Sequence, residues 1–143
     1  MGGYEAHYYG TDALIQKAQQ ELDTDLEVHY AAMAAADDSA LVWFYTGKEY
    51  QAHTYCVMEC NIVDKNEYTF VRMHNPLMRG QDVAVLQWKG GYCYFINNPE
   101  CTTLRFTDEY GIHDVEIAGC PYVEYRSIKP AECYFLDAEG NEV

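Results

Sequence analysis

Histidine and cysteine are the side chains of this sequence best suited to metal chemistry, and one spacing brings them together. The segment His53-x2-Cys56-x3-Cys60 combines two residue types that bind zinc. The surrounding residues have the apolar, branched pattern of a strand, so His53 and Cys56 are expected on opposite faces. Cys56 and Cys60 would lie roughly 13 Å apart along such a strand, too far for one zinc ion or a disulfide. The sequence therefore predicts no metal site and no cofactor.

Two further histidines are candidate catalytic groups. His113 precedes Asp114, but neighbouring residues on a strand face opposite ways, so this carboxylate cannot orient that imidazole directly. His74 lies beside a proline-containing loop, a position that suits a catalytic histidine, but the pattern favours a surface histidine there. The chain has no Gly-x-Ser-x-Gly elbow, no P-loop and no Gly-x-Gly-x-x-Gly motif. We predict no catalytic residue, and an enzyme remains the less favoured alternative.

Tyrosines and turn carboxylates are the remaining candidates for a binding surface. The chain has 14 tyrosines, a residue type enriched both in protein interfaces and on half-buried strand faces. Tyr92 and Tyr94 share one predicted strand face, which is either part of a core or an aromatic binding surface. Asp108 and Glu109 lie together in a predicted turn. These four residues are the predicted binding site.

The charge balance restricts the partners. With 23 acidic and 9 basic residues, the formal net charge is −14, which disfavours direct nucleic acid binding and anionic membrane surfaces. A basic protein partner would be attracted, although excess acid also serves solubility alone. The six cysteines fall mostly in predicted strands, and the first residues resemble neither a signal peptide nor a complete myristoylation site. We therefore expect reduced thiols and a cytoplasmic protein, with homo-oligomerisation left open.

The clearest structural pattern is a hairpin over Asp82–Asn97. Two apolar runs flank Gly90-Gly91, and both residues of a two-residue type I′ turn need a positive φ. This turn would pair Trp88 with Cys93. It places one apolar face on Ala84, Leu86, Trp88, Cys93 and Phe95 and the other on Val83, Val85, Tyr92, Tyr94 and Ile96. We expect one face to lie on the core and the other to be partly covered, with the helical segment as one candidate cover.

The remaining pattern predicts an α+β fold in a single domain over residues 1–143. Residues 11–36 have helical spacing, with a break near Asp23 and a capping box at Thr24-Asp25-Leu26-Glu27 that starts a second helix or bends a single one. Residues 40–143 have strand periodicity, with long runs at 50–63 and 68–74, a loop at 77–81 and further strands to residue 136. The helical segment would pack on an antiparallel, largely meandering sheet or partial barrel of roughly seven to nine strands.

Together these features favour a non-enzymatic, cytosolic protein-binding domain with an acidic, tyrosine-containing surface. An inhibitor or immunity-type protein that occupies a basic site on its target is the more specific form of this hypothesis. The alternative is a small enzyme or ligand-binding domain with a pocket between helix and sheet. A deep pocket with convergent polar groups would favour the alternative, and a contiguous acidic or aromatic patch would favour the protein-binding function.

Overall fold

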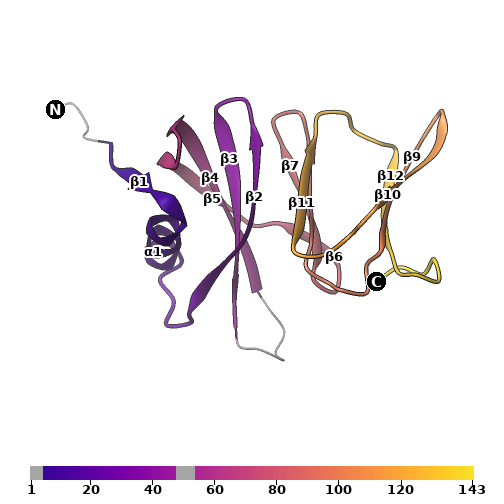
Figure 1. Cartoon of the computed structure of the whole chain (residues 1–143), viewed down its shortest axis with the longest axis horizontal. Helices are drawn as coiled ribbons and strands as arrows, with labels where there is room; N and C mark the ends of the chain where they lie inside the picture. The colour runs from indigo at the N-terminus through magenta and orange to yellow at the C-terminus, as the bar shows by residue number, and fades with distance from the viewer. Residues whose placement is uncertain (1–4, 48–53) are drawn as a thin grey trace. The chain divides into compact units, whose positions relative to one another are not determined.

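The computed structural model describes residues 5–47 and 54–143 as one N-terminal helix and three antiparallel sheets (Figure 1). This confirms the predicted α+β class with antiparallel sheets, and the sheets do not close into a barrel. The chain divides into two compact units, Met1–Asn75 and Pro76–Val143, which we describe separately. The single domain over residues 1–143 remains a prediction.

The first unit contains the helix and a five-stranded sheet. Its elements in chain order are β1 (His7–Tyr9), α1 (Gly10–Leu22), β2 (Val28–Ala36), β3 (Ser39–Thr46), β4 (Thr54–Asp64) and β5 (Glu67–His74). The sheet order is β1-β5-β4-β3-β2, so β2 to β5 form a meander and β1 pairs with its far edge. The predicted strand over 50–63 is found from Thr54, and residues 50–53 lie outside the described part.

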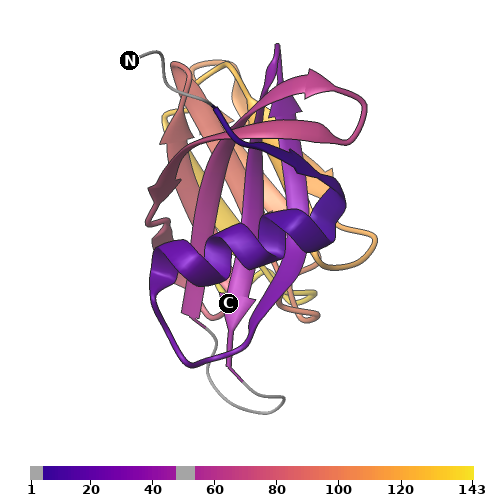
Figure 2. The same ribbon diagram turned by 90° about the vertical axis from the view of Figure 1, so that its left-hand side faces the viewer.

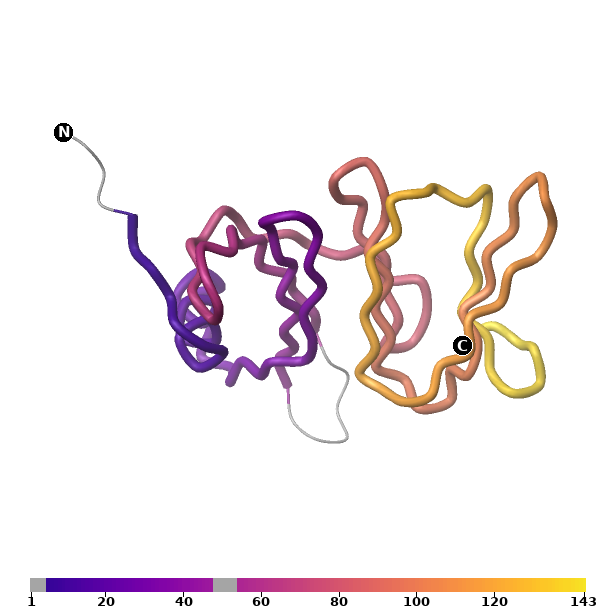
Figure 3. The backbone as a smooth tube through the Cα atoms, turned by 45° about the horizontal axis from the view of Figure 1, so that its top comes forward, coloured from indigo at the N-terminus to yellow at the C-terminus, as the bar shows by residue number. Residues whose placement is uncertain are grey.

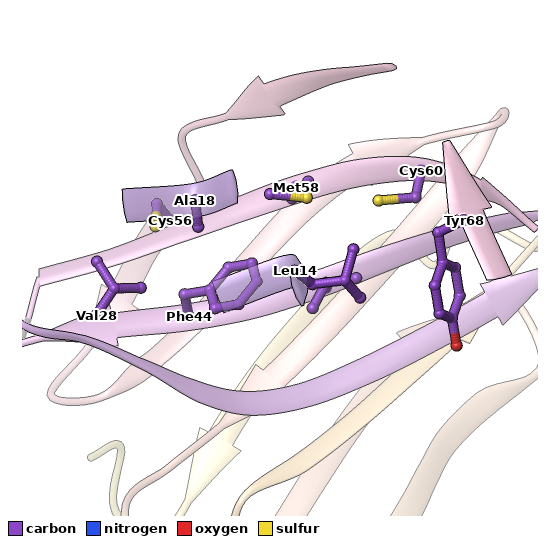
Figure 4. Packing of buried hydrophobic residues seen from close by; sticks show 9 residues of the cluster. Leu14, Ala18, Val28, Phe44, Cys56, Met58, Cys60 and Tyr68 are labelled. Carbon is purple, nitrogen blue, oxygen red and sulfur yellow. The ribbon is translucent and has the colours of Figure 1, made fainter. Parts of the chain in front are cut away.

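Helix α1 lies across one face of this sheet (Figure 2). Leu14 and Ala18, four residues apart, are fully buried against side chains of the sheet. Figure 4 shows them among Val28, Phe44, Cys56, Met58, Cys60 and Tyr68. Apolar packing therefore fills the space between helix and sheet.

The predicted second helix is wrong, because residues 28–36 form strand β2. The threonine that suggested a capping box instead closes a local turn, since Thr24 Oγ1 accepts a hydrogen bond from the Leu26 N–H at 3.1 Å. Tyr30 and Met33 are three residues apart, as on one side of a helix, but they share a face of β2 because of a bulge between Tyr30 and Ala32. Both side chains pack against the core. Pairing with β3 thus overrides the helix propensity of the alanine-rich segment.

The chain leaves α1 through a segment that one side chain holds in place. Asp23 has a φ of 47°, the left-handed conformation that ends many helices. Gln19 Nε2 then donates to the carbonyl oxygens of Thr24 and Leu26, at 2.6 and 2.9 Å. Its Oε1 accepts from the Val28 N–H at 3.2 Å. The Gln19 side chain therefore provides hydrogen-bond partners for three backbone groups of the non-helical segment between α1 and β2.

The second unit contains two sheets. Its strands are β6 (Leu77–Gly80), β7 (Val83–Trp88), β8 (Gly91–Ile96), β9 (Thr103–Asp108), β10 (Gly111–Glu116), β11 (Tyr122–Arg126) and β12 (Glu132–Leu136). A four-stranded sheet has the order β11-β8-β7-β6, and a three-stranded sheet has the order β10-β9-β12. The predicted loop at 77–81 is mostly strand β6, a short, exposed edge strand whose pairing with β7 has an irregular register. It lacks the apolar alternation that would have revealed it.

The predicted hairpin forms, with its turn one residue earlier than expected. Lys89 and Gly90 have φ values of 48° and 77°, so they are the two central residues of the turn. Trp88 pairs with Gly91 and Leu86 with Cys93. Position 91 requires glycine because of its packing and not because of the turn. A Cβ there would lie 2.1 Å from the Arg126 carbonyl oxygen of β11. The shift is two residues in register, so it leaves both predicted faces unchanged.

One face of this hairpin forms the core of the second unit. Val83, Val85, Tyr94 and Ile96 pack with Leu104 and Phe106 of β9 and with Phe135 of β12. The two sheets of the second unit thus enclose this cluster. One face of the hairpin therefore lies on a core, as expected, and the cover of the other face by the helical segment stays a prediction.

Candidate functional site at the end of the β9–β10 hairpin

The β9–β10 hairpin ends in a short acidic turn, seen in orange in Figure 3. Glu109 and Tyr110 connect the strands, and Asp108 Oδ1 accepts a hydrogen bond from the Tyr110 N–H at 2.8 Å. Gly111 follows with a φ of 121°, a conformation that suits glycine. Asp108 therefore has a structural role in the turn besides its charge.

An ion pair fixes the outer face of the same hairpin. Arg105 and Asp114 are direct cross-strand partners, with Nε–Oδ1 at 2.8 Å and Nη2–Oδ2 at 3.0 Å. This two-point contact lowers the pKa of the Asp114 carboxyl and raises the pKa of the Arg105 guanidinium. Residues 103–116 carry four carboxylates and one arginine, so the hairpin stays acidic after this pairing.

Beside the turn lies a groove of about 360 Å³. Its lining combines two aromatic rings, two charged groups of opposite sign, an imidazole, a hydroxyl and two apolar side chains: Phe106, Asp108, His113, Tyr125, Arg126, Ser127, Ile128 and Pro130. All of these residues come from β9, β10, β11 and the segment that follows β11. The groove is thus a feature of the second unit alone.

The polar groups of the groove are held by neighbours. His113 Nε2 lies 3.3 Å from Asp108 Oδ1, so this carboxylate can pair with the imidazole when the ring is protonated. The Arg126 guanidinium carbon lies 4.5 Å from the centre of the Phe106 ring, and its Nε lies 3.3 Å from Glu124 Oε2. A carboxylate, an imidazole and a guanidinium near apolar surface suit the binding of a peptide segment.

Large apolar side chains are exposed around this turn. Tyr110, Ile112 and Ile128 are 84%, 64% and 79% exposed. Tyr110 and Ile112 flank Gly111 in the hairpin, and Ile128 lines the groove. We call Asp108, Glu109, Tyr110, Ile112 and the groove the hairpin-end surface. Exposed apolar groups with polar groups around them mark many surfaces that bind another protein.

The four predicted binding residues separate in the structure. Asp108 and Glu109 both lie in the hairpin-end surface. Tyr94 is only 1% exposed, and its ring packs edge-on against Phe106 with the ring centres 5.0 Å apart. Burial raises the pKa of its hydroxyl, and the ring supports the groove from behind without facing a partner. Tyr92 is half-buried, with Lys129 Nζ 5.8 Å from its ring centre.

Sequence inspection did not identify the apolar part of the hairpin-end surface. Tyr110 lies in the predicted turn and Ile112 directly after it, and Ile128 lies in an irregular segment near Pro130. Apolar residues at such positions have little reason to be buried. The presence of large apolar residues in a turn and in an irregular segment was therefore the feature of the sequence that could have identified this surface. The approach of β11 to His113 depends on tertiary structure, so the sequence pattern does not reveal it.

The other chemically suggestive residues lie elsewhere. His74 Nε2 is 2.8 Å from Glu59 Oε1 in the first unit, so its imidazole is in hydrogen-bond contact with a carboxylate of the neighbouring strand. Cys56 and Cys60 are buried in the core under α1, and His53 lies outside the described residues. Among residues 5–47 and 54–143, no three histidine, cysteine or carboxylate side chains are grouped so that they could hold a metal ion.

A second hollow, of about 380 Å³, also belongs to the second unit. It is lined by Pro99, Glu100, Thr102, Asp137, Ala138 and Glu139. The alternative hypothesis expected a pocket between helix and sheet, where Leu14 and Ala18 are fully buried instead. Both hollows described here are lined by residues of the second unit alone.

The six thiols differ in their surroundings, which leads to a prediction about reactivity. Cys120 is exposed, whereas Cys56, Cys60, Cys93 and Cys101 are buried and Cys133 is half-buried. Burial raises the pKa of the Cys56 thiol to about 11 and that of the Cys60 thiol to about 12. Because the thiolate is the reactive form, raising the pKa of a thiol from 9 to 11 reduces its thiolate fraction at pH 8 about a hundredfold.

With a disulfide-exchange reagent such as DTNB at pH 8, Cys120 should therefore react in a single fast phase. Cys120→Ser should remove that phase and leave only the slower reactions of the buried and half-buried thiols. After denaturation without reductant, six thiols should react with the wild-type protein. A fast phase that persists in Cys120→Ser, or fewer than six thiols after denaturation, would contradict this prediction.

No protein-family profile, curated protein or solved structure matches this chain. In the part of the chain that the structure describes, every helix is too short or too polar to cross a lipid bilayer.

Proposed function

We propose that this protein is a non-enzymatic binding domain that uses the hairpin-end surface to hold a basic protein partner. The observation that carries this proposal is the exposure of Tyr110, Ile112 and Ile128 next to Asp108 and Glu109. The apolar groups supply contact area, and the carboxylates select for positive charge. The formal net charge of −14 adds a long-range attraction that speeds the encounter.

The partner that fits this surface presents lysine or arginine beside apolar side chains. A basic group can pair with Asp108 or Glu109, and an apolar group can enter the groove against Phe106 and Pro130. An inhibitor or immunity-type role, in which the protein covers a basic site on its target, is the specific form of this function that we propose. We also propose a cytoplasmic location, which accords with the expected reduced thiols.

The test combines salt dependence with charge reversal. Immobilised protein should retain a basic partner at low salt and release it at high salt, because the Debye length falls from about 10 Å at 0.1 M to about 3 Å at 1 M. With the purified partner, Asp108→Lys combined with Glu109→Lys should slow association by about tenfold and change dissociation less. Stopped-flow or surface-based kinetics gives both rates.

Two further variants control this experiment. Glu100→Lys with Glu139→Lys makes the same change of charge at the second hollow, and it should slow association less than the hairpin variant. Glu109→Lys alone keeps the hydrogen bond between Asp108 and the Tyr110 N–H, so it separates charge from turn stability. Equal effects at both places, or binding that ignores salt, would show that the acidity serves solubility and not this interface.

A second candidate function, a small-ligand or enzyme site, has one observation in its favour. The groove brings His113 within 3.3 Å of Asp108 and places Arg126 nearby. An imidazole paired with a carboxylate can transfer protons, and a guanidinium can bind an anion. Without a deep enclosure, this arrangement supports the protein-binding function better.

A further inference from the structure

Strand β10 is an edge strand of the three-stranded sheet β10-β9-β12. Within residues 5–47 and 54–143, no other strand pairs with that edge. Five of its six residues, Gly111 to Asp114 and Glu116, are exposed, so its outer side is open to solvent. An open edge carries backbone groups that can pair with another strand.

The register shows which backbone groups are available. Gly111 pairs with Asp108 across a two-residue turn, and beyond the other end of β10 the Ile117 N–H donates to the Thr102 carbonyl oxygen at 2.9 Å. Hydrogen-bonded positions alternate along an antiparallel pair. Residues 111, 113 and 115 therefore direct their backbone groups to β9, and residues 112, 114 and 116 direct theirs outward.

The other edge strands are less suited to pairing. Strand β1 has three residues, β6 has four, and β2 contains a bulge. The five residues of β11 are all half-buried, whereas five of the six residues of β10 are exposed. Beside β12, Glu142 forms a bridge to Leu136, and the Val143 N–H donates to the Phe135 carbonyl oxygen. Strand β10 has six residues paired in unbroken register, and it contains no lysine, proline or bulge of the kind that protects sheet edges.

The side chains of β10 give each face of an added strand a distinct environment. Ile112, Asp114 and Glu116 lie on one face, where two of the three are acidic. His113 and Val115 lie on the other face, and His113 lines the groove with Phe106. A strand paired with β10 would therefore lay alternate side chains beside carboxylates and beside the apolar groove.

From these observations we infer that the outer edge of β10 binds an extended segment of the basic partner as an added antiparallel strand. The segment alternates basic side chains, next to Asp114 and Glu116, with apolar side chains, next to His113 and the groove. In this pairing the backbone groups of its basic residues face β10, because they lie opposite residues 112, 114 and 116. The inference rests on the proposed function and specifies how the partner is recognised.

The experiment uses three synthetic peptides with identical side chains and charge. The first is acetyl-Lys-Val-Lys-Leu-Lys-Val-Lys-amide, the second carries backbone N-methyl groups on its inner two lysines, and the third carries them on its two valines. The first and third should bind with similar affinity by calorimetry. The second should bind at least about tenfold more weakly, because its methyl groups replace the hydrogens that face β10. Absence of binding by the first peptide, or equal affinity of the second and third, would overturn the inference.

Amide exchange in the full-length protein gives an independent readout. Saturation with the first peptide should slow exchange of the Ile112, Asp114 and Glu116 amides by at least about tenfold. The amides of His113 and Val115, already bonded to β9, should change much less. Equal protection of both sets, or protection that grows with protein concentration without peptide, would overturn the inference, the latter by showing a second copy at the edge.

A protein variant separates this inference from the proposed function. Asp114→Pro and Asp114→Ala both lose the contact with Arg105, but only proline also loses the outward N–H. Circular dichroism establishes that both variants fold, and Glu116→Pro against Glu116→Ala repeats the comparison if they do not. Weaker peptide binding by proline than by alanine supports strand pairing. Equal binding, with the partner still sensitive to salt and to Glu109→Lys, would overturn the strand pairing alone.

Discussion

Replacing Gly91 with alanine is expected to lower the free energy of unfolding by roughly 3 kcal/mol or more. An added Cβ would lie 2.1 Å from the Arg126 carbonyl oxygen and 2.8 Å from the Ser127 Cα. Both are backbone atoms of β11 and the residue after it, so no side chain can rotate to make room. Relief requires β11 to move away from β8, which breaks the ladder between them. Urea unfolding followed by circular dichroism measures the change.

Gly90→Ala is the matched control for Gly91→Ala. Gly90 has a φ of 77°, and an added Cβ there would meet no atom within 4 Å. The expected loss is therefore only the conformational cost of a left-handed alanine, about 1 kcal/mol. If the two variants lose equal stability, the close approach of β8 and β11 does not limit what position 91 accepts.

Replacing Leu14 with alanine is expected to lower the free energy of unfolding by about 2–5 kcal/mol. Leu14 is fully buried between α1 and the first sheet, where Figure 4 shows it near Phe44 and Met58. The variant loses the burial of the side chain and leaves a cavity that the surrounding strands can only partly fill. The same urea titration measures the loss.

Leu26→Ala makes the same chemical change at an exposed position. Leu26 is 55% exposed in the segment that follows α1. The expected change is within about 0.5 kcal/mol, as for most surface substitutions. A similar loss in Leu14→Ala and Leu26→Ala would mean that α1 contributes little to the core of the first unit.

Regular patterns made most of the fold predictable. Runs of aromatic and branched apolar residues predicted the strand at Tyr68–His74 and the hairpin at residues 83–96, because such residues suit buried strands. The second helix was mispredicted because the bulge at Tyr30 and Ala32 gave a strand the apparent spacing of a helix. A bulge depends on the partner strand, so a local pattern cannot reveal it.

The candidate site was predictable only in part. Asp108 and Glu109 were predicted from their turn position and charge, which are local properties. The pattern around Tyr94 left open whether its face of the hairpin is part of a core or a binding surface, because the strands β9 and β12 that pack on this face are separate in sequence. The groove requires β11 to approach His113, and the order β11-β8-β7-β6 that places it there follows from tertiary packing.

The pairing of β1 with β5 has a consequence for how the first unit assembles. Strand β1 joins residue 7 to residue 69, and the Gly10 N–H donates to the Asn66 carbonyl oxygen at 2.9 Å in the turn before β5. The hairpins of β2 to β5 close over short loops, whereas this contact must close a loop of about 60 residues. During synthesis β1 emerges before β5, the strand with which it pairs. We therefore expect β1, which precedes the meander in sequence, to be the last strand of this sheet to pair.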